Sequence, residues 1–89
     1  MAETFEEGLR RYISMVRIDI GRNVKRLRLQ QGRKQEDVAI AAGYTSRSSL
    51  SKIELGQRLP SVIRLLSLAY ALGVPLSTLT GRRHPRRER

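Results

Sequence analysis

A polar stretch in the middle of the chain carries arginine, serine and lysine side chains within two turns of a predicted helix. Leu50 and Ile53 stand at i and i+3 and define an apolar face for this helix. Arg47, Ser48 and Lys52 fall off that face. Arginine can donate two hydrogen bonds to the O6 and N7 of guanine, serine can serve either base edge, and lysine can reach guanine or phosphate. These residue types at this spacing indicate recognition of DNA bases.

The residues before this stretch predict another short helix that would hold it in place. Val38, Ala39 and Ala42 fall at i, i+1 and i+4 and form one apolar face. Gly43 then supplies the positive φ that ends a helix or turns the chain sharply into the next one. Two short helices joined by such a turn, with a polar face on the second, describe a helix-turn-helix, in which the second helix fits the major groove.

The chain resembles the Cro/C1-type (lambda-repressor-like) helix-turn-helix family from about Ile20 to Leu79. Five linked segments carry the resemblance: Ile20-Gly21-Arg22, Arg26-Leu27-Arg28, Gln35 to Gly43, Leu50 to Ser61 and Leu68 to Pro75. The resemblance implies an all-α fold, a five-helix lambda-repressor-like DNA-binding domain, to which this chain adds an extra N-terminal helix. The spacing from Gly43 to Leu50 is one residue longer than usual, which implies a longer turn and leaves the start of the second helix of the motif open by one residue.

The same resemblance assigns roles to individual polar residues. Arg47, Ser48 and Lys52 match the positions at which the family reads bases, and Ser46 matches one that often touches a thymine methyl group or a phosphate. Gln35 opens the first helix of the motif, where its amide and the free backbone N–H groups can hold a phosphate oxygen together, as the family's glutamine does. Four further residues are expected to bind neighbouring phosphates: Lys34, Ser51, Gln57 and Arg58. The alternative for each is an ordinary solvated side chain.

Glu54 has a different expected role, because a carboxylate beside DNA phosphates is unfavourable unless it is neutralised. The family pairs a glutamate here with an arginine on the first helix, and Arg28 matches that position. The resemblance therefore implies a structural Arg28–Glu54 ion pair that fixes the recognition helix against the first helix. The alternative is that both side chains are solvated.

The net charge of +10 is unevenly distributed along the chain. Residues 1–19 hold three arginines against four acidic residues, a net −1. Residues 20–81 hold ten basic and three acidic residues, a net +7, and residues 82–89 hold five arginines and one glutamate, a net +4. Charge alone would also fit a solvated basic surface. Together with the motif, it predicts double-stranded DNA as the partner.

Three parts are predicted along the chain: a helical leader at 1–19, a helix-turn-helix domain at 20–81 and a basic, disordered tail at 82–89. The helices of the domain are expected near residues 20–31, 34–42, 46–55, 61–72 and 76–80. Thr4 and Glu7 have the spacing of a capping box that opens the leader. Apolar residues then recur every three or four positions without losing phase at Gly21. Two arrangements fit this pattern: one long helix that reaches Gln31, or two helices joined by a kink near 19–21.

The predicted fourth helix is apolar over about 220° of its circumference, about twice the width that a core-facing stripe requires. The excess surface must meet something beyond the minimal domain. The leader offers a matching stripe, and we expect it to form a dimerisation arm through Phe5, Leu9, Tyr12, Ile13 and Val16. The alternative is that the leader folds back on the fourth helix of its own chain.

Catalysis and cofactor binding are not expected. The chain has no cysteine, and its only histidine, His84, stands in the basic tail. Glu36 and Asp37 are adjacent and therefore point in different directions around a helix, and the sequence has no phosphate loop or metal-ligand cluster. The acidic amino terminus is unlike a signal peptide, and no apolar run approaches the roughly 20 residues that span a bilayer. We expect a cytoplasmic, nucleoid-associated protein.

Two functions of different classes fit these observations. The first is a sequence-specific transcriptional regulator, a homodimeric repressor or autoregulator that reads a short palindrome through the helix at 46–55. The second is an antitoxin or an architectural DNA-binding module that recruits a protein partner through its N-terminal helix. The individual polar residues on the recognition face favour the first function.

Overall fold

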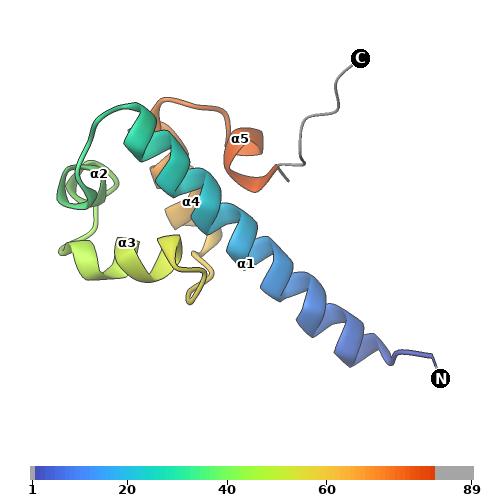
Figure 1. Ribbon diagram of the computed structural model, residues 1–89. Helices are drawn as coiled ribbons and strands as arrows, with labels where there is room; N and C mark the ends of the chain where they lie inside the picture. Colours follow the sequence, from blue (N-terminus) through green and yellow to red (C-terminus); the bar gives the residue numbers. More distant parts are fainter. Residues whose placement is uncertain (1, 82–89) are drawn as a thin grey trace, which may run out of the picture.

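One helix, α1 (Phe5–Gln30), spans the long dimension of the molecule, and four shorter helices form the body of the molecule beside its second half (Figure 1). The third, fourth and fifth helices pack against α1, and the second packs against the third and fourth. The computed structural model describes residues 2–81. The other helices are α2 (Gln35–Ala41), α3 (Arg47–Glu54), α4 (Val62–Leu72) and α5 (Leu76–Thr80). The described residues contain no strand, and the expected all-α fold is confirmed. The predicted basic tail at 82–89, with His84, lies outside the described residues.

The helix α1 is continuous through the region where the sequence also allows a kink. Thr4 opens it with the predicted capping box: the Glu7 N–H donates to Thr4 Oγ1 at 3.1 Å, and the Thr4 N–H donates to Glu7 Oε1 at 3.0 Å. The helix runs to Gln30, so the single long helix is confirmed. Although α1 has 26 residues, neither it nor any other helix within residues 2–81 is apolar enough over sufficient length to span a membrane.

At Gly21 the helix α1 does not bend; instead, α3 crosses α1 closely at this residue. A Cβ atom at this position would lie 2.3 Å from the carbonyl oxygen of Ile53 and 2.9 Å from that of Glu54. Only a residue without a side chain allows the backbones of α1 and α3 to approach this closely. The end of α3 is therefore seated directly on the backbone of α1.

The core lies between the second half of α1 and the four shorter helices, which also pack against one another. Its buried hydrophobic residues are Ile20, Val24, Leu27, Val38, Ala39, Ala42, Leu50, Ile53, Leu68, Ala69, Leu72 and Leu79. The apolar faces predicted for α2 and α3 are among them, so both predictions are confirmed. Burying a large aliphatic side chain contributes about 1.5–3 kcal/mol. Two helices of only seven and eight residues are held in place in this way, because helices this short are marginal on their own.

Polar side chains of α1 and of the turn after it hold the carbonyl ends of α4 and α5. The buried Asn23 donates from Nδ2 to the carbonyl oxygens of Leu79 and Gly81, both at 2.7 Å. Gln31 and Arg33 each donate to one of the last two carbonyl groups of α4 at 2.8 Å. These bonds satisfy carbonyl groups that a helix leaves unpaired at its end.

The first half of α1, residues 5–15, projects from the body of the molecule and is called the arm below (Figure 1). The base of the arm is tied to the turn after α3, because Arg17 Nε donates to the carbonyl oxygen of Gly56 at 2.8 Å. Since α1 is unbroken, the arm does not fold back on α4. The fold-back alternative is therefore not the arrangement of this structure.

The predicted dimerisation stripe is exposed only toward the tip of the arm. Phe5 is 82% exposed, Tyr12 61% and Leu9 43%. Ile13 is half-buried, and Val16 packs against the core of its own chain. Val16 thus contributes to the fold of its own chain, and the freely accessible part of the stripe ends before it.

Gly21→Ala should lower the free energy of unfolding by about 1–3 kcal/mol, because the added methyl group must push α3 away from α1. Urea unfolding followed by circular dichroism measures this loss. Gly8→Ala is the matched control, since an added Cβ there would meet only the flexible Glu3 side chain, 3.4 Å away. The control should be neutral or stabilising by up to about 1 kcal/mol. Equal effects of the two substitutions would contradict the close crossing.

Candidate nucleic-acid interface

The turn between α2 and α3 sets how the second helix of the motif is presented. Gly43 has a φ of 85°, as predicted for the end of a helix. The Tyr44 N–H donates to the carbonyl oxygen of Ala39 at 2.9 Å and closes the end of α2. Ser46 is the extended N-cap, and α3 begins at Arg47. The helix therefore starts one residue later than the range predicted from the sequence.

The two faces of α3 have opposite environments. Leu50 and Ile53 are fully buried. Arg47, Ser48 and Lys52 are exposed, as the spacing of the sequence predicts. A shallow groove of about 400 Å³ runs along this exposed face and is lined by Arg47, Ser48, Ser51, Lys52, Leu55 and Gln57. The polar face of α3 is thus open to a ligand while its apolar face is fixed.

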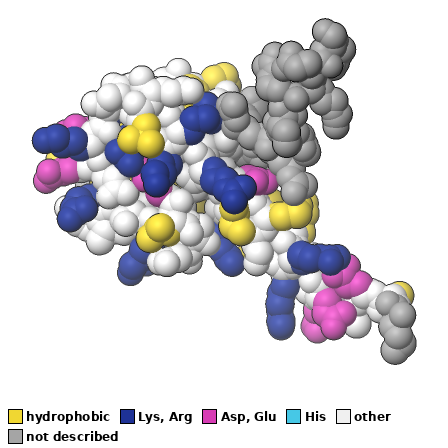
Figure 2. Space-filling model, viewed as in Figure 1, with side chains coloured by type: hydrophobic (Ala, Val, Ile, Leu, Met, Phe, Trp, Pro, Cys, Tyr) yellow, Lys and Arg dark blue, Asp and Glu magenta, His cyan; other side chains and the backbone are white. Residues whose placement is uncertain are grey.

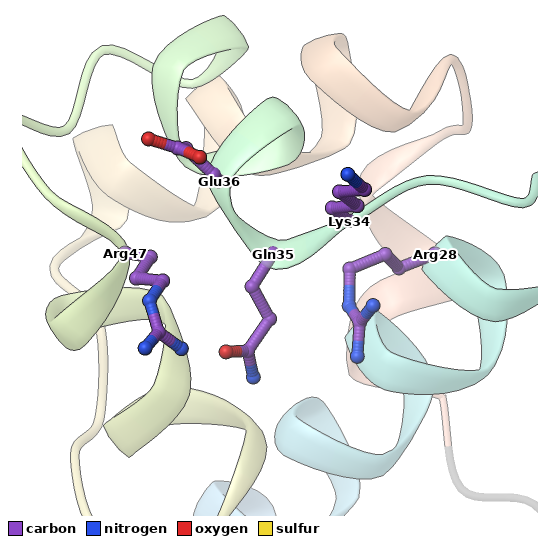
Figure 3. Close-up of a pocket in the computed structure, with 5 residues that line it drawn as sticks. All are labelled: Arg28, Lys34, Gln35, Glu36 and Arg47. Atoms are coloured by element: carbon purple, nitrogen blue, oxygen red, sulfur yellow. The ribbon is translucent and has the colours of Figure 1, made fainter.

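A second hollow, of about 420 Å³, lies at the start of α2 (Figure 3). It is lined by Arg28, Lys34, Gln35, Glu36 and Arg47. Figure 3 shows the side chain of Gln35 between the guanidinium groups of Arg47 and Arg28, whereas Glu36 points away from it. Because Arg47 lines both this hollow and the groove on α3, the two adjoin. Together they form one surface across α2 and α3.

Glu54 is buried at the end of α3 and joins three helices through its carboxylate. Arg28 of α1 donates from Nε to Oε2 at 2.7 Å and from Nη2 to Oε1 at 3.1 Å. Gln35 of α2 donates from Nε2 to Oε1 at 3.0 Å. Arg28 and Glu54 are 9% and 8% exposed, and they form the ion pair that the family resemblance implies. The paired arginine neutralises a carboxylate that would otherwise repel phosphates.

The remaining residues predicted to contact DNA lie around the groove on α3, except Lys34, which lines the hollow at the start of α2. Ser46 and Ser48 share a hydrogen bond between their hydroxyl groups at 2.9 Å. Arg58 donates from Nη1 to Ser49 Oγ at 3.3 Å, which holds this arginine beside α3. The other residues predicted to bind phosphate are exposed or half-buried: Lys34, Ser51 and Gln57. Every residue predicted to contact DNA is therefore accessible, whereas the predicted structural pair of Arg28 and Glu54 is buried.

Arg64 of α4 supports the turn between α2 and α3. Its guanidinium carbon lies 4.5 Å from the centroid of the Tyr44 ring, and its Nη1 donates to the carbonyl oxygen of Gly43 at 3.1 Å. Burial raises the pKa of Tyr44 above its usual value, although the charges of Arg64 and Arg58 act in the opposite direction. Neither residue belongs to a periodic pattern, so the sequence gives no sign of this contact.

Basic side chains dominate the body, and acidic ones gather toward the end of the arm. Figure 2 shows Lys and Arg spread over the visible face of the body and several Asp and Glu side chains near the tip of the arm. With Glu54 neutralised by Arg28, the exposed acidic residues of 20–81 are Glu36 and Asp37. The body therefore carries a field that attracts a polyanion.

The chain is similar in sequence and in fold to known helix-turn-helix proteins. A helix-turn-helix family model matches residues 24–79. An uncharacterized HTH-type transcriptional regulator, y4dJ, from Sinorhizobium fredii is 47% identical over 55 residues, which cover 62% of this chain and 70% of that protein. The restriction-modification controller protein C.AhdI from Aeromonas hydrophila matches with a TM-score of 0.67 and 33% identity over 71% of this chain and 94% of that one. The hypothetical transcription factor NHTF from Neisseria matches with a TM-score of 0.71 and 25% identity over 75% and 76% of the two chains.

Glu54→Ala should lower the free energy of unfolding by about 3–5 kcal/mol, because it leaves the buried charge of Arg28 without its partner. Thermal unfolding monitored by circular dichroism tests this. Glu3→Ala is the matched control, since Glu3 pairs with Arg11 at the surface of the arm. An exposed pair of this kind contributes about 0–1 kcal/mol. A loss as small for Glu54 as for Glu3 would show that the buried pair does not hold the helices together.

Proposed function

The chain belongs to the Cro/C1-type helix-turn-helix family, and we propose that it is a transcriptional regulator that binds specific sites on double-stranded DNA through α3. The two opposite faces of α3, one buried and one exposed, support this proposal. Leu50 and Ile53 fix the helix in the core, and the side chains that can read bases stand exposed on its other face. A helix held in this way can enter the major groove as a rigid unit.

Base reading is assigned to the exposed face of α3. Arg47 would donate two hydrogen bonds to the O6 and N7 of a guanine, and Lys52 would reach a guanine or a phosphate. Ser48 would contact an adjacent base edge, and Ser46 a thymine methyl group or a phosphate. A good bidentate contact discriminates against the wrong base by about 1–3 kcal/mol. Arg47 is therefore expected to contribute most to sequence preference.

Phosphate binding is assigned to the start of α2 and to the rim of the groove. A glutamine amide carries two N–H donors, and the side chain of Gln35 donates one of them to Glu54. The second, together with the first backbone N–H groups of α2, would hold a phosphate oxygen. The residues proposed to bind neighbouring phosphates are Lys34, Ser51, Gln57 and Arg58. These contacts fix the position of α3 on the duplex without reading its sequence.

A single α3 of eight residues reads only a few base pairs, so a specific site requires two copies of the chain. We therefore propose a homodimer that reads a short palindrome with half-sites about one helical turn apart. Two similar proteins are named as a restriction-modification controller protein and a hypothetical transcription factor, which supports a regulatory role. Repression or autoregulation is the proposed outcome, because a dimer bound across a promoter blocks access to it.

Arg47→Ala should cost about 1–3 kcal/mol of binding free energy at the best site and relax the preference at one base position in each half-site. Gln35→Ala should instead weaken binding to all sequences nearly alike, because a phosphate contact carries no sequence information. Titration of a panel of single-base variants of the site measures both effects.

Arg10→Ala is the matched control for charge, since Arg10 is an exposed arginine of the arm. It should leave the base preference unchanged. Circular dichroism of Gln35→Ala must show a folded protein, because Gln35 also binds Glu54. If Arg47→Ala retained both the affinity and the base preference, α3 would not read the groove through this residue.

Removal of residues 82–89 should lower DNA affinity and flatten its dependence on salt, because these residues carry five arginines and one glutamate. Each phosphate contact that is lost reduces the slope of log K against log salt concentration by about 0.9. Sequence preference should survive, since contacts to phosphates mainly displace counterions and do not read bases. Binding isotherms at several salt concentrations provide the measurement, and an unchanged slope would place these residues away from the DNA.

A further inference from the structure

Two apolar stripes are uncovered on the same chain. The arm stripe consists of Phe5, Leu9 and Tyr12, which are 82%, 43% and 61% exposed. The α4 stripe consists of Val62, Ile63, Leu66 and Tyr70, which are 69%, 74%, 51% and 87% exposed. Seven large apolar side chains on two continuous helical faces are far more than the scattered exposed residues of an ordinary surface.

The α4 stripe is separate from the face by which α4 joins the core. Leu68, Ala69 and Leu72 are buried, whereas Val62, Leu66 and Tyr70 recur at i, i+4 and i+8 on another side of the helix. This explains why α4 is apolar over more of its circumference than a core requires. A groove of about 440 Å³ runs beside the stripe and is lined by Ala41, Ala42, Gly43, Ile63, Leu66, Ser67 and Tyr70. Its small side chains leave room for a large one.

The two stripes do not meet within one chain. The arm continues the axis of α1 away from the body (Figure 1). Its base is fixed by the bond from Arg17 to Gly56 and by the close crossing at Gly21. Reaching α4 of the same chain would require the arm to break α1, with the loss of its helical hydrogen bonds. A second copy of the chain can reach it without any change in the fold.

We propose that the arm stripe of each copy packs into the groove beside the α4 stripe of a second copy. Each copy thus gives its arm to the other, an arrangement called the exchange below. Because it is reciprocal, the exchange closes a two-fold dimer and leaves neither stripe uncovered. This inference deepens the homodimer of the proposed function by naming the surfaces that form it. The acceptor surface lies on α4 and the end of α2 and shares no lining residue with the groove on α3 that is assigned to DNA.

The surface available matches what a stable dimer needs. Phe5, Tyr12 and Tyr70 are each more than half exposed, and with about 150–250 Å² per aromatic side chain they expose roughly 450 Å² per chain. Leu9 and the aliphatic residues of the α4 stripe add to this area. A standard interface buries about 800 Å² per partner. The two stripes together approach that value, whereas either stripe alone falls well short.

Charge favours pairing of the arm with the body over other arrangements. The first turns of the chain carry Glu3, Glu6 and Glu7, whereas α4 has no acidic residue and carries Arg64. Glu3 is paired with Arg11, but parallel pairing of two arms would bring Glu6 and Glu7 of the two copies together, and like charges repel. Antiparallel pairing of two arms would avoid this, but it would leave the α4 stripe of both copies in water. The exchange alone covers both stripes and places the acidic tip against a basic body.

Cysteine cross-linking tests the exchange directly, because the natural chain contains no cysteine. Full-length Leu9→Cys and Leu66→Cys proteins are prepared separately, mixed under conditions that allow subunits to exchange, and treated with a short bifunctional maleimide. The mixture should give linked dimers, whereas each protein alone should give only background. Leu29→Cys is the control, since Leu29 is an exposed leucine of α1 outside both stripes.

Each other pattern of cross-links would overturn the proposal. Linked dimers of Leu9→Cys alone would show that arms pair with arms, and linked dimers of Leu66→Cys alone would show that α4 pairs with α4. Background linking in all samples would show that the two stripes do not meet. The cross-linking experiment contains no DNA, so a negative result would be distinguishable from a failure of DNA recognition.

Sedimentation velocity provides an independent measurement on the same surfaces. Phe5→Glu and Tyr70→Glu should each raise the dimer dissociation constant at least tenfold, whereas Leu29→Glu should leave it unchanged. All three positions are exposed, and circular dichroism should show an unaltered helical content. A wild-type chain that stays monomeric, or variants that dimerise as well as the wild type, would overturn the exchange. Specific DNA binding by such a chain would leave base reading by α3 standing and would remove only the dimer.

Discussion

The position of the DNA-facing helix depends on one buried carboxylate. Glu54 at the end of α3 accepts hydrogen bonds from Arg28 of α1 and Gln35 of α2, so a single charged group links three helices. A carboxylate can be buried here only because the arginine neutralises it and both oxygens accept hydrogen bonds. The requirement for these partners fixes the angle between the helices more narrowly than apolar contacts alone can. The crossing at Gly21 sets the distance between α1 and α3 at the same place.

The continuity of α1 connects this site to the arm. The same helix contributes Arg28 to the buried pair, Gly21 to the crossing and, through Arg17, the bond to the turn after α3. The helix α1 is exposed at one end and packs against α3 near the other. Because α1 is continuous, a partner bound at the arm would have a fixed position relative to the polar face of α3. In the proposed dimer, the exchanged arms would therefore set the separation of the two α3 helices, which is the quantity that a palindromic site requires.

Much of this arrangement could be predicted from the sequence, because it rests on local patterns. The apolar spacings around Val38 and Leu50 and the positive φ of Gly43 were sufficient for the helix-turn-helix. The choice between a kink and a continuous α1 could not be made from the sequence, because a glycine suits a bend in a helix as well as the close approach of another helix. The approach of α3 to Gly21 is a contact between residues far apart in the chain. Bonds from side chains to distant carbonyl groups, such as those of Asn23, leave no periodic trace in a sequence. The Arg28–Glu54 pair could be expected only through the family resemblance, since 26 residues separate its members.

In the proposed function, α3 reads the sequence of double-stranded DNA. Selection of bound fragments from a random duplex pool by the full-length chain, at a fixed and stated salt concentration, tests it most directly. Base reading by α3 in a dimer should give a single enriched motif of two inverted half-sites about one helical turn apart. A pool that stays random after selection, with binding that depends on salt alone, would show that the basic body holds DNA only through its phosphates. That result would contradict the assignment of α3 as a base-reading helix.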